Sequence, residues 1–164
     1  MDNIYQNQLD RQAANFAALS PLSFVARAGN LYPQAEAVVH GDLSRSWGEV
    51  YQRCVLMASA LAARGIGKGD TVAVMLPNIP EMFEAHFFVP MTGAVLNAIN
   101  TRLDPKTIAF ILDHAEAKVL FTDREYAVVI TQALALSQRD ILVVNVEDSL
   151  FDGGVNIGDL TFDD

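Results

Sequence analysis

The chain has 164 residues, of which 51% are apolar and 19% are charged, and a globular chain near this length buries about 68–70% of the surface that it exposes when unfolded. This composition excludes a disordered or fibrous protein and indicates one domain's worth of packed material. The single cysteine, Cys54, excludes an internal disulfide and a cysteine-based zinc or iron–sulfur site, which favours a reducing compartment.

Charge is concentrated at the end of the chain. The net charge is −9, and residues 140–164 hold seven acids and no lysine or arginine, which leaves −2 for the rest. Because no basic run is present, binding to nucleic acid or to an anionic membrane surface is not expected. The most apolar stretch, residues 82–99, is interrupted by polar residues, glycine and proline, so no membrane span is predicted. The first eleven residues lack the features of an export signal, and a cytoplasmic location is predicted.

The first third of the chain predicts an arm, a helix and a hairpin. Residues 1–19 are polar and are expected to form a surface arm. Ser20 followed by Pro21 predicts a helix start, and Pro33 predicts its end. Residues 36–40 and 43–45 flank Gly41-Asp42, a break that is typical of a tight β-hairpin.

A longer helix is predicted from Ser46 to Gly65. Ser46 and Glu49 match the reciprocal capping box, and the apolar residues that follow are spaced by threes and fours. The glycine-dense stretch 65–70 superficially resembles a phosphate-binding loop. It follows a helix and precedes a strand, however, whereas phosphate loops follow a strand and open a helix, so a helix stop and turn are favoured.

From Thr71 onward, short apolar runs alternate with helical patterns. Strands with both faces buried are predicted at residues 71–76, 94–99, 118–121 and 141–146, and helices at 81–91, 104–115 and 124–137. Strict alternation predicts an α/β fold with a doubly wound, mostly parallel sheet, helices on both faces and the small N-terminal hairpin. Residues 159–162 are expected to begin another element, which makes the sheet an incomplete portion of a larger domain.

Candidate site residues are few. Loops that follow parallel strands are where such sheets bind ligands, and on this ground Asn100 and Arg102 are candidates to line a substrate or CoA site. His86, among three phenylalanines, is a third candidate, although a hydrogen-bonded helix histidine is the commoner outcome. A solvated or backbone-bonded arginine is likewise the commoner outcome for Arg102. No residue matches a catalytic motif, and no histidine has the neighbours of a metal site.

Two segments carry a family resemblance: GKGDTVAVMLPNIPE at residues 67–81 and GAVLNAINTRL at 93–103, supported by SWGEV at 46–50 and IAFILDHAEAKVLF at 108–121. The chain resembles the N-terminal region of AMP-forming acyl-CoA synthetases, members of the adenylate-forming superfamily. The wording EAHFFVPM at residues 84–91 is similar to the branch that acts on short- and medium-chain acids.

The resemblance implies an N-terminal fragment of a longer ligase, in which a carboxylic acid and ATP form an acyl-adenylate that is transferred to CoA, with Mg²⁺ on the phosphates. It implies three parts: the arm 1–19, an α/β subdomain 20–147, and an acidic tail 148–164 that stops before the family's ATP-binding loop. No cofactor is expected for the fragment, which is expected to be inactive and to need the remainder of the ligase chain as its partner. The alternatives are a stand-alone α/β ligand-binding module and a self-associating interaction module.

Overall fold

The computed structural model describes residues 10, 12, 16–158 and 160–162. The predicted arm 1–19 therefore lies largely outside the described residues, as does Asp159 of the predicted last element. The first described helix, α1 (Pro21–Leu31), begins at Ser20, whose Oγ accepts a hydrogen bond from the Leu22 amide at 3.3 Å. Strands β1 (Glu36–His40) and β2 (Leu43–Ser46) then pair antiparallel around Gly41, so the predicted hairpin is confirmed.

Helix α2 (Trp47–Ala63) begins with the predicted capping box. The Ser46 amide donates to Glu49 Oε2 at 2.7 Å, and the Glu49 amide donates to Ser46 Oγ at 3.3 Å. The helix ends before Gly65, whose φ of +80° is the left-handed conformation that glycine adopts without strain. The glycine-dense stretch therefore closes a helix at the amino end of the sheet, as predicted.

The capping box gives a first testable prediction. Replacing Ser46 by alanine leaves the Glu49 amide without its acceptor and is expected to lower the free energy of unfolding by about 1 kcal/mol. Ser59→Ala, an exposed position inside the same helix, is the matched control, and it is expected to be neutral or slightly stabilising. Urea denaturation of the two variants measures the difference, and equal stabilities would contradict a role for the cap.

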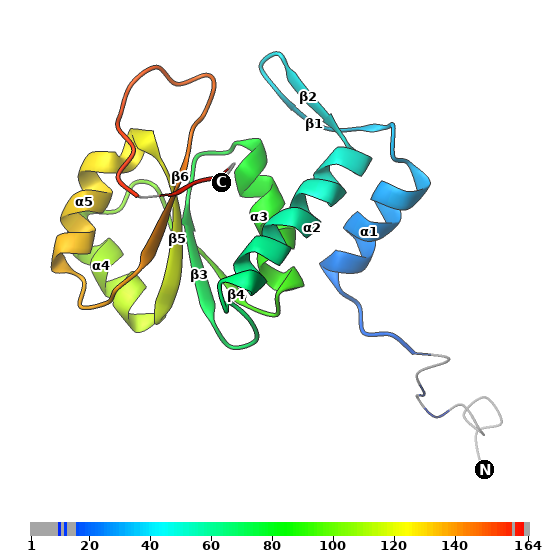
Figure 1. Ribbon diagram of the computed structural model, residues 1–164, viewed down its shortest axis with the longest axis horizontal. Helices are drawn as coiled ribbons and strands as arrows, with labels where there is room; N and C mark the ends of the chain where they lie inside the picture. The colour runs from blue at the N-terminus through cyan, green and yellow to red at the C-terminus, as the bar shows by residue number, and fades with distance from the viewer. Residues whose placement is uncertain (1–9, 11, 13–15, 159, 163–164) are drawn as a thin grey trace, which may run out of the picture.

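Five parallel strands form the main sheet: β3 (Thr71–Met75), β4 (Val95–Ala98), β5 (Ala117–Asp123), β6 (Leu142–Val146) and β7 (Leu160–Thr161), in the spatial order β4-β3-β5-β6-β7. The connecting helices are α3 (Pro80–Met91), α4 (Pro105–His114) and α5 (Ala127–Leu136), the last preceded by a short 3₁₀ turn at Arg124–Tyr126. Helices α2 and α3 lie on one face and α4 and α5 on the other (Figure 1). The predicted doubly wound α/β fold is confirmed.

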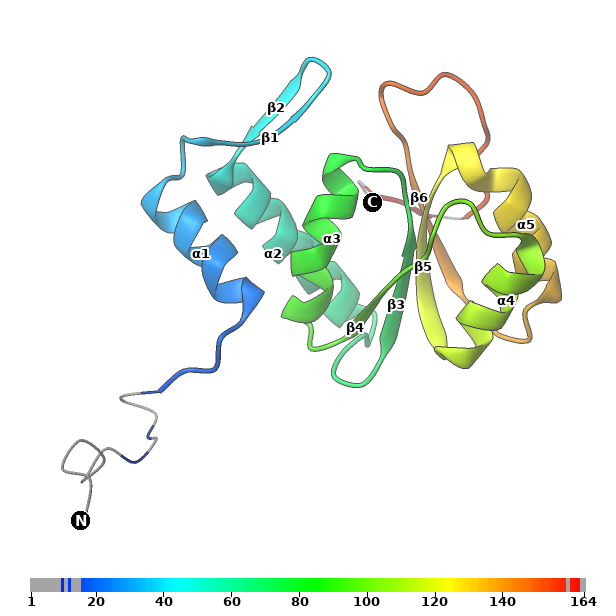
Figure 2. The same cartoon turned by 180° about the vertical axis from the view of Figure 1, so that it is seen from behind.

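Two hydrophobic cores lie on opposite faces of the sheet. Val72 and Val74 of β3 pack with α2 and α3, whereas Ala73 and Met75 of the same strand pack with α4 and α5. This alternation follows from the two-residue period of a strand. Helix α1 lies outside the first layer, against α2 and α3, as the view from behind shows (Figure 2).

Strand β4 differs from its prediction. It is an edge strand and only partly buried, with Val95 56% exposed, because the chain returns from it across β3 to form β5 on the other side. Strand β5 extends to Ala117 and Asp123, beyond the predicted 118–121. The chain reversal at β4 also places the switch point of the sheet between β3 and β5, where open α/β sheets normally bind ligands.

Candidate functional site

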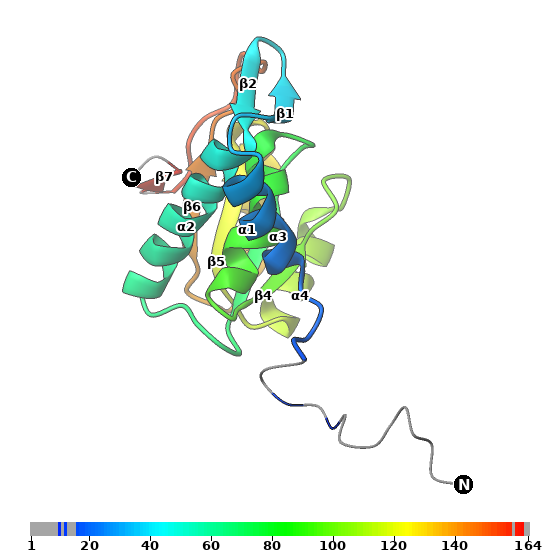
Figure 3. The ribbon, with the colours of Figure 1, turned by 90° about the vertical axis from the view of Figure 1, so that its right-hand side faces the viewer.

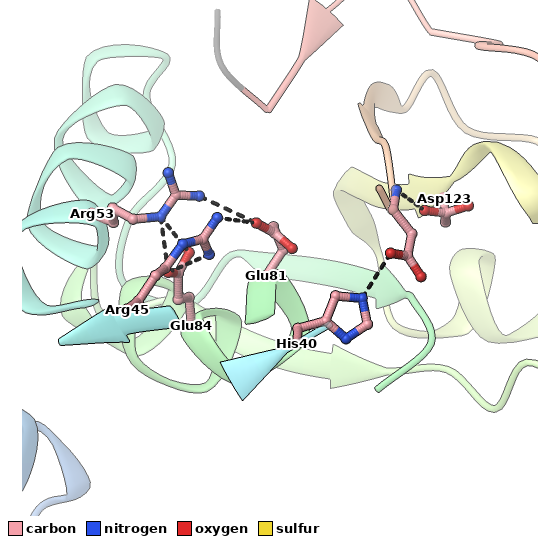
Figure 4. A network of polar contacts seen from close by, with 7 residues as sticks. His40, Arg45, Arg53, Glu81, Glu84 and Asp123 are labelled. Atoms are coloured by element: carbon pink, nitrogen blue, oxygen red, sulfur yellow. Dashed lines mark hydrogen bonds and ion pairs between the residues drawn. The ribbon is translucent and has the colours of Figure 1, made fainter. Parts of the chain in front are cut away.

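A pocket of about 300 Å³ lies at the carboxyl edge of the sheet, between the hairpin β1–β2 and the ends of β6 and β7. Its charged lining comes from four separate parts of the chain: His40 and Arg45 on the hairpin, Arg53 on α2, Glu81 on α3, and Glu147 and Asp148 after β6. Figure 4 shows most of these side chains turned toward one another rather than outward.

Two arginines and two glutamates form one cluster, and Arg45, Arg53 and Glu81 of this cluster line the pocket. Arg45 Nη1 and Arg53 Nε each donate to Glu84 Oε1 at 2.9 Å. Glu81 Oε1 accepts from Arg45 Nη2 at 2.9 Å and from Arg53 Nη2 at 3.3 Å. The cluster is formally neutral, and it ties the hairpin to α2 and α3.

Glu84 is the most unusual member, because its side chain is fully buried. Burial raises the pKa of Glu84 above its ordinary value even though the hydrogen bond and charge of Arg53 and the charge of Arg45 act in the opposite direction. The neighbouring Cys54 thiol is buried too, and desolvation, followed by the Glu84 charge, raises its pKa to about 12. Cys54 is therefore a packed core residue and is poorly suited to act as a nucleophile.

A second series of contacts links the hairpin to the carboxyl end of the sheet (Figure 4). His40 Nε2 lies 2.7 Å from Asp148 Oδ1. The Asp148 amide donates to Asp123 Oδ2 at 3.0 Å, and Asp123, which is fully buried at the end of β5, also accepts from the Glu125 amide at 2.8 Å. Desolvation works against ionisation of Asp148, but the Leu150 amide and His40 outweigh it and hold the pKa of Asp148 below its usual value.

The lowered pKa of Asp148 predicts a defined pH dependence. Its contribution to stability is present above the ordinary aspartate pKa and is lost as the pH falls through the lower folded-state pKa. Near pH 7, Asp148→Asn is expected to lower the free energy of unfolding by about 1.5 kcal/mol relative to the wild type. This difference in stability, called the gap below, should narrow toward pH 3. Urea titrations at both pH values measure the gap. Asp152→Asn, an exposed acid of the same segment, should show almost no gap at either pH, and a gap for Asp148→Asn that is constant with pH would contradict the assignment.

Asn145 holds the segment between β6 and β7 in place. Its buried side chain makes four hydrogen bonds to backbone groups, donating to the Gly158 and Leu160 carbonyl oxygens at 2.9 and 2.8 Å and accepting from the Ile157 and Gly158 amides at 2.8 and 3.1 Å. Gly158 lies so close that a Cβ atom there would collide with the Val143 carbonyl oxygen. Among the described residues between β6 and β7 there is no helix, and the Asn145 side chain holds β7 in position through these hydrogen bonds.

The three candidates named from the sequence lie outside this pocket. His86 is on the exposed face of α3, where its Nδ1 lies 2.8 Å from the Met82 carbonyl oxygen. It borders a shallower depression of about 470 Å³ beside the hairpin. Asn100 and Arg102 are exposed in one turn after β4, where Asn100 Oδ1 accepts from the Arg102 amide at 2.9 Å. Their role near a substrate or CoA site stays a prediction.

The pocket's own charged residues were not singled out from the sequence. One signal was available: Glu84 lies in an otherwise apolar stretch of helix between Phe83 and Ala85, and Glu81 is one turn earlier on the same side. A carboxylate on a buried face needs a cationic partner. The partners of Glu84, Arg45 and Arg53, precede it by 39 and 31 residues along the chain.

The pocket does not fit a nucleotide phosphate. Arg45 and Arg53 are each engaged by both Glu81 and Glu84, and the other wall carries the carboxylates of Glu147 and Asp148. Within the described ranges, no group of three or more His, Cys, Asp or Glu side chains is placed to hold a metal ion. Among the same residues, no helix has the length and apolarity needed to cross a bilayer. The arrangement is that of a structural charge cluster that positions the hairpin over the carboxyl edge.

Comparison with known proteins identifies the family to which the chain is similar. Residues 25–157 match the family model described as AMP-binding enzyme. The chain is 46% identical over 133 residues to the peroxisomal acetate/butyrate–CoA ligase of Arabidopsis thaliana, covering 81% of this chain and 23% of that protein. It is 48% identical over 123 residues to a peroxisomal butyrate–CoA ligase of the same plant, covering 75% of this chain and 22% of the relative.

Solved structures agree on the fold. The crystal structure of the anthranilate CoA ligase AuaEII in complex with anthranoyl-AMP superposes with a TM-score of 0.80 at 20% identity, over 93% of this chain and 29% of that one. The chain spans less than a quarter of the length of the two curated relatives. The resemblance seen in the sequence is confirmed by a family model that matches most of the chain, and the chain belongs to the AMP-binding enzyme family.

Proposed function

We propose that the chain is the N-terminal part of an AMP-forming acid–CoA ligase that acts on a short- or medium-chain carboxylic acid. The observation that carries the proposal is its identity of 46% and 48% to ligases named for acetate and butyrate. In this reaction the carboxylate attacks the α-phosphate of ATP and releases pyrophosphate, and the CoA thiol then displaces AMP from the acyl-adenylate to give the thioester.

Within that enzyme, the described residues supply a scaffold. The cluster of Arg45, Arg53, Glu81 and Glu84 fixes the hairpin, and Asp123 and Asn145 fix the segment after β6. The cationic groups of the pocket are committed to ion pairs, which supports assigning ATP, CoA and Mg²⁺ to the rest of the ligase. The division into residues 1–19, 20–147 and 148–164 stays a prediction of the sequence, as does a cytoplasmic location; the two Arabidopsis relatives carry the word peroxisomal in their names.

Acid-dependent exchange of pyrophosphate into ATP tests the scaffold role. The purified 164-residue chain, supplied with Mg²⁺, ATP and acetate or butyrate, is expected to give no exchange above a protein-free blank. Exchange by the chain alone would overturn the scaffold role and would place the reactive groups within these residues. Saturable binding of ATP, CoA or butyrate, seen as a raised melting temperature without exchange, would favour a stand-alone binding module instead.

A further inference from the structure

The loop between β6 and β7 contains the one aspartate of the chain that is followed by glycine, Asp152-Gly153. Residues 147–158 are called the β6–β7 loop below. The sequence holds no Asn-Gly pair. Both residues of the Asp-Gly pair are exposed. Figure 3, like Figure 1, shows the loop in orange at the same end of the sheet as the hairpin β1–β2.

The carboxyl group of Asp152 and the amide of Gly153 are both unengaged. Within the part of the chain that the structure describes, the Asp152 carboxylate accepts no hydrogen bond and forms no ion pair, and the Gly153 amide donates no hydrogen bond. Gly153 has a φ of +141°, a conformation that glycine adopts without the strain that a side chain would bring. A free carboxyl group therefore lies next to an amide that no side chain of its own residue shields.

Asp148 is a contrasting case on the same loop. It too is followed by a small residue, Ser149. Its carboxylate, however, accepts a hydrogen bond from the Leu150 amide at 2.9 Å and lies 2.7 Å from His40 Nε2. These contacts must break before the carboxyl carbon of Asp148 can meet the next amide. The fold thus restrains one aspartate of the loop and leaves the other free.

We propose that Asp152-Gly153 is a site of spontaneous isoaspartate formation. The Gly153 amide nitrogen attacks the carbon of the protonated Asp152 carboxyl group. A nitrogen–carbon bond forms, a carbon–oxygen bond breaks, and the amide proton and the hydroxyl group leave as one water molecule. The resulting succinimide takes up one water molecule at either carbonyl carbon, with cleavage of the nitrogen–carbon bond there. Opening at the main-chain carbonyl gives isoaspartate, and opening at the other carbonyl restores aspartate.

The modification would alter the loop because contacts hold it on both sides of the pair. The Phe151 carbonyl oxygen accepts a hydrogen bond from Arg124 Nη2. Gly154 lies so close to Arg124 that a Cβ atom at position 154 would collide with the Arg124 carbonyl oxygen. Isoaspartate inserts an additional carbon atom into the main chain between these two contacts. We therefore expect faster hydrogen exchange in residues 147–157 of the modified chain than in the unmodified one.

Ageing of the purified 164-residue chain near neutral pH and at body temperature tests the proposal. Peptide mass spectrometry with electron-transfer fragmentation identifies isoaspartate at each aspartate, and heavy-oxygen water labels every residue that has passed through the succinimide. We expect both signals to accumulate at position 152. The matched variant Asp152→Glu keeps the charge but would need a larger, slowly formed ring, so both signals at this position should disappear. Heavy-oxygen uptake at position 152 that persists in this variant would overturn the proposal.

The same rates in guanidinium chloride separate the effect of the fold from that of the local sequence. Folding is expected to slow the reaction at position 148 by about tenfold or more, because the Asp148 carboxylate must first leave its hydrogen-bonded partners. Position 152 should stay within about threefold of its unfolded rate, as an unrestrained loop position would. Absence of isoaspartate at position 152 in the folded chain would overturn the proposal, and so would equal slowing by folding at the two positions.

Discussion

Replacing Arg45 by methionine is expected to lower the free energy of unfolding by about 3 kcal/mol. The change keeps an unbranched side chain of similar length but leaves the fully buried carboxylate of Glu84 with Arg53, which is 29% exposed, as its remaining cationic partner in the cluster. Removing one partner from a buried ion cluster costs more than the pairing itself contributes, because the remaining charges stay desolvated. Urea denaturation near pH 7 measures the loss.

The matched control for this experiment is Arg139→Met. Arg139 also pairs with a glutamate, Glu116 at 3.0 Å, but the Glu116 side chain is 76% exposed, so a loss below about 0.5 kcal/mol is expected. Burial raises the pKa of Glu84 whereas the charge of Arg45 lowers it, so removal of Arg45 should raise this pKa further. Arg45→Met should therefore gain more stability than the wild type as Glu84 takes up a proton, and the loss that it causes should shrink toward acid pH. Equal losses for the two variants would show that the cluster contributes no more than a surface ion pair.

Asn145→Ala is the second substitution with a large expected effect. It removes four hydrogen bonds at once and leaves backbone groups of residues 157–160 without their partners. An orphaned buried polar group costs about 1–3 kcal/mol, and because water reaches part of this segment, a total of about 3 kcal/mol is expected. The loss should be local, so hydrogen exchange should accelerate at residues 157–162 before it does in β3 or β5.

Asn156→Ala provides the control on the same segment. Asn156 is exposed and donates a single hydrogen bond, to Glu147 Oε1 at 2.6 Å, so its removal should cost less than about 0.5 kcal/mol and leave exchange near β7 unchanged. Unchanged exchange at residues 157–162 in Asn145→Ala would contradict the role assigned to this side chain.

Elements with strong local signals were predictable. Pro21 after Ser20, the capping box at Ser46 and Glu49, and Gly41-Asp42 in the hairpin each fix a boundary through a few adjacent residues, and the structure has these boundaries where the sequence predicts them. The strict alternation of strands and helices then selected the parallel, doubly wound sheet.

Features that depend on distant residues were not predictable. The apolar sequence of β4 predicts a buried strand, but β4 lies at the edge of the sheet and is only partly buried. Its edge position results from the chain crossing β3 to form β5 on the other side, and no local sequence pattern predicts that crossing. Glu84 indicates that a cation is needed nearby without saying that Arg45 on the hairpin supplies it. Asn145 reads as one polar residue in an apolar strand, and its four partners lie twelve to fifteen residues later.

We propose that these residues act as one structural part of a longer acid–CoA ligase. Formation of butyryl-CoA from butyrate, ATP and CoA tests it most directly in a hybrid ligase, in which this chain replaces the matched 133-residue segment of the Arabidopsis acetate/butyrate–CoA ligase. The 164-residue chain is assayed beside the hybrid. We expect the hybrid to form the thioester and the chain alone to form none. A soluble, folded hybrid that forms no thioester, or a chain that forms it unaided, would contradict the claim.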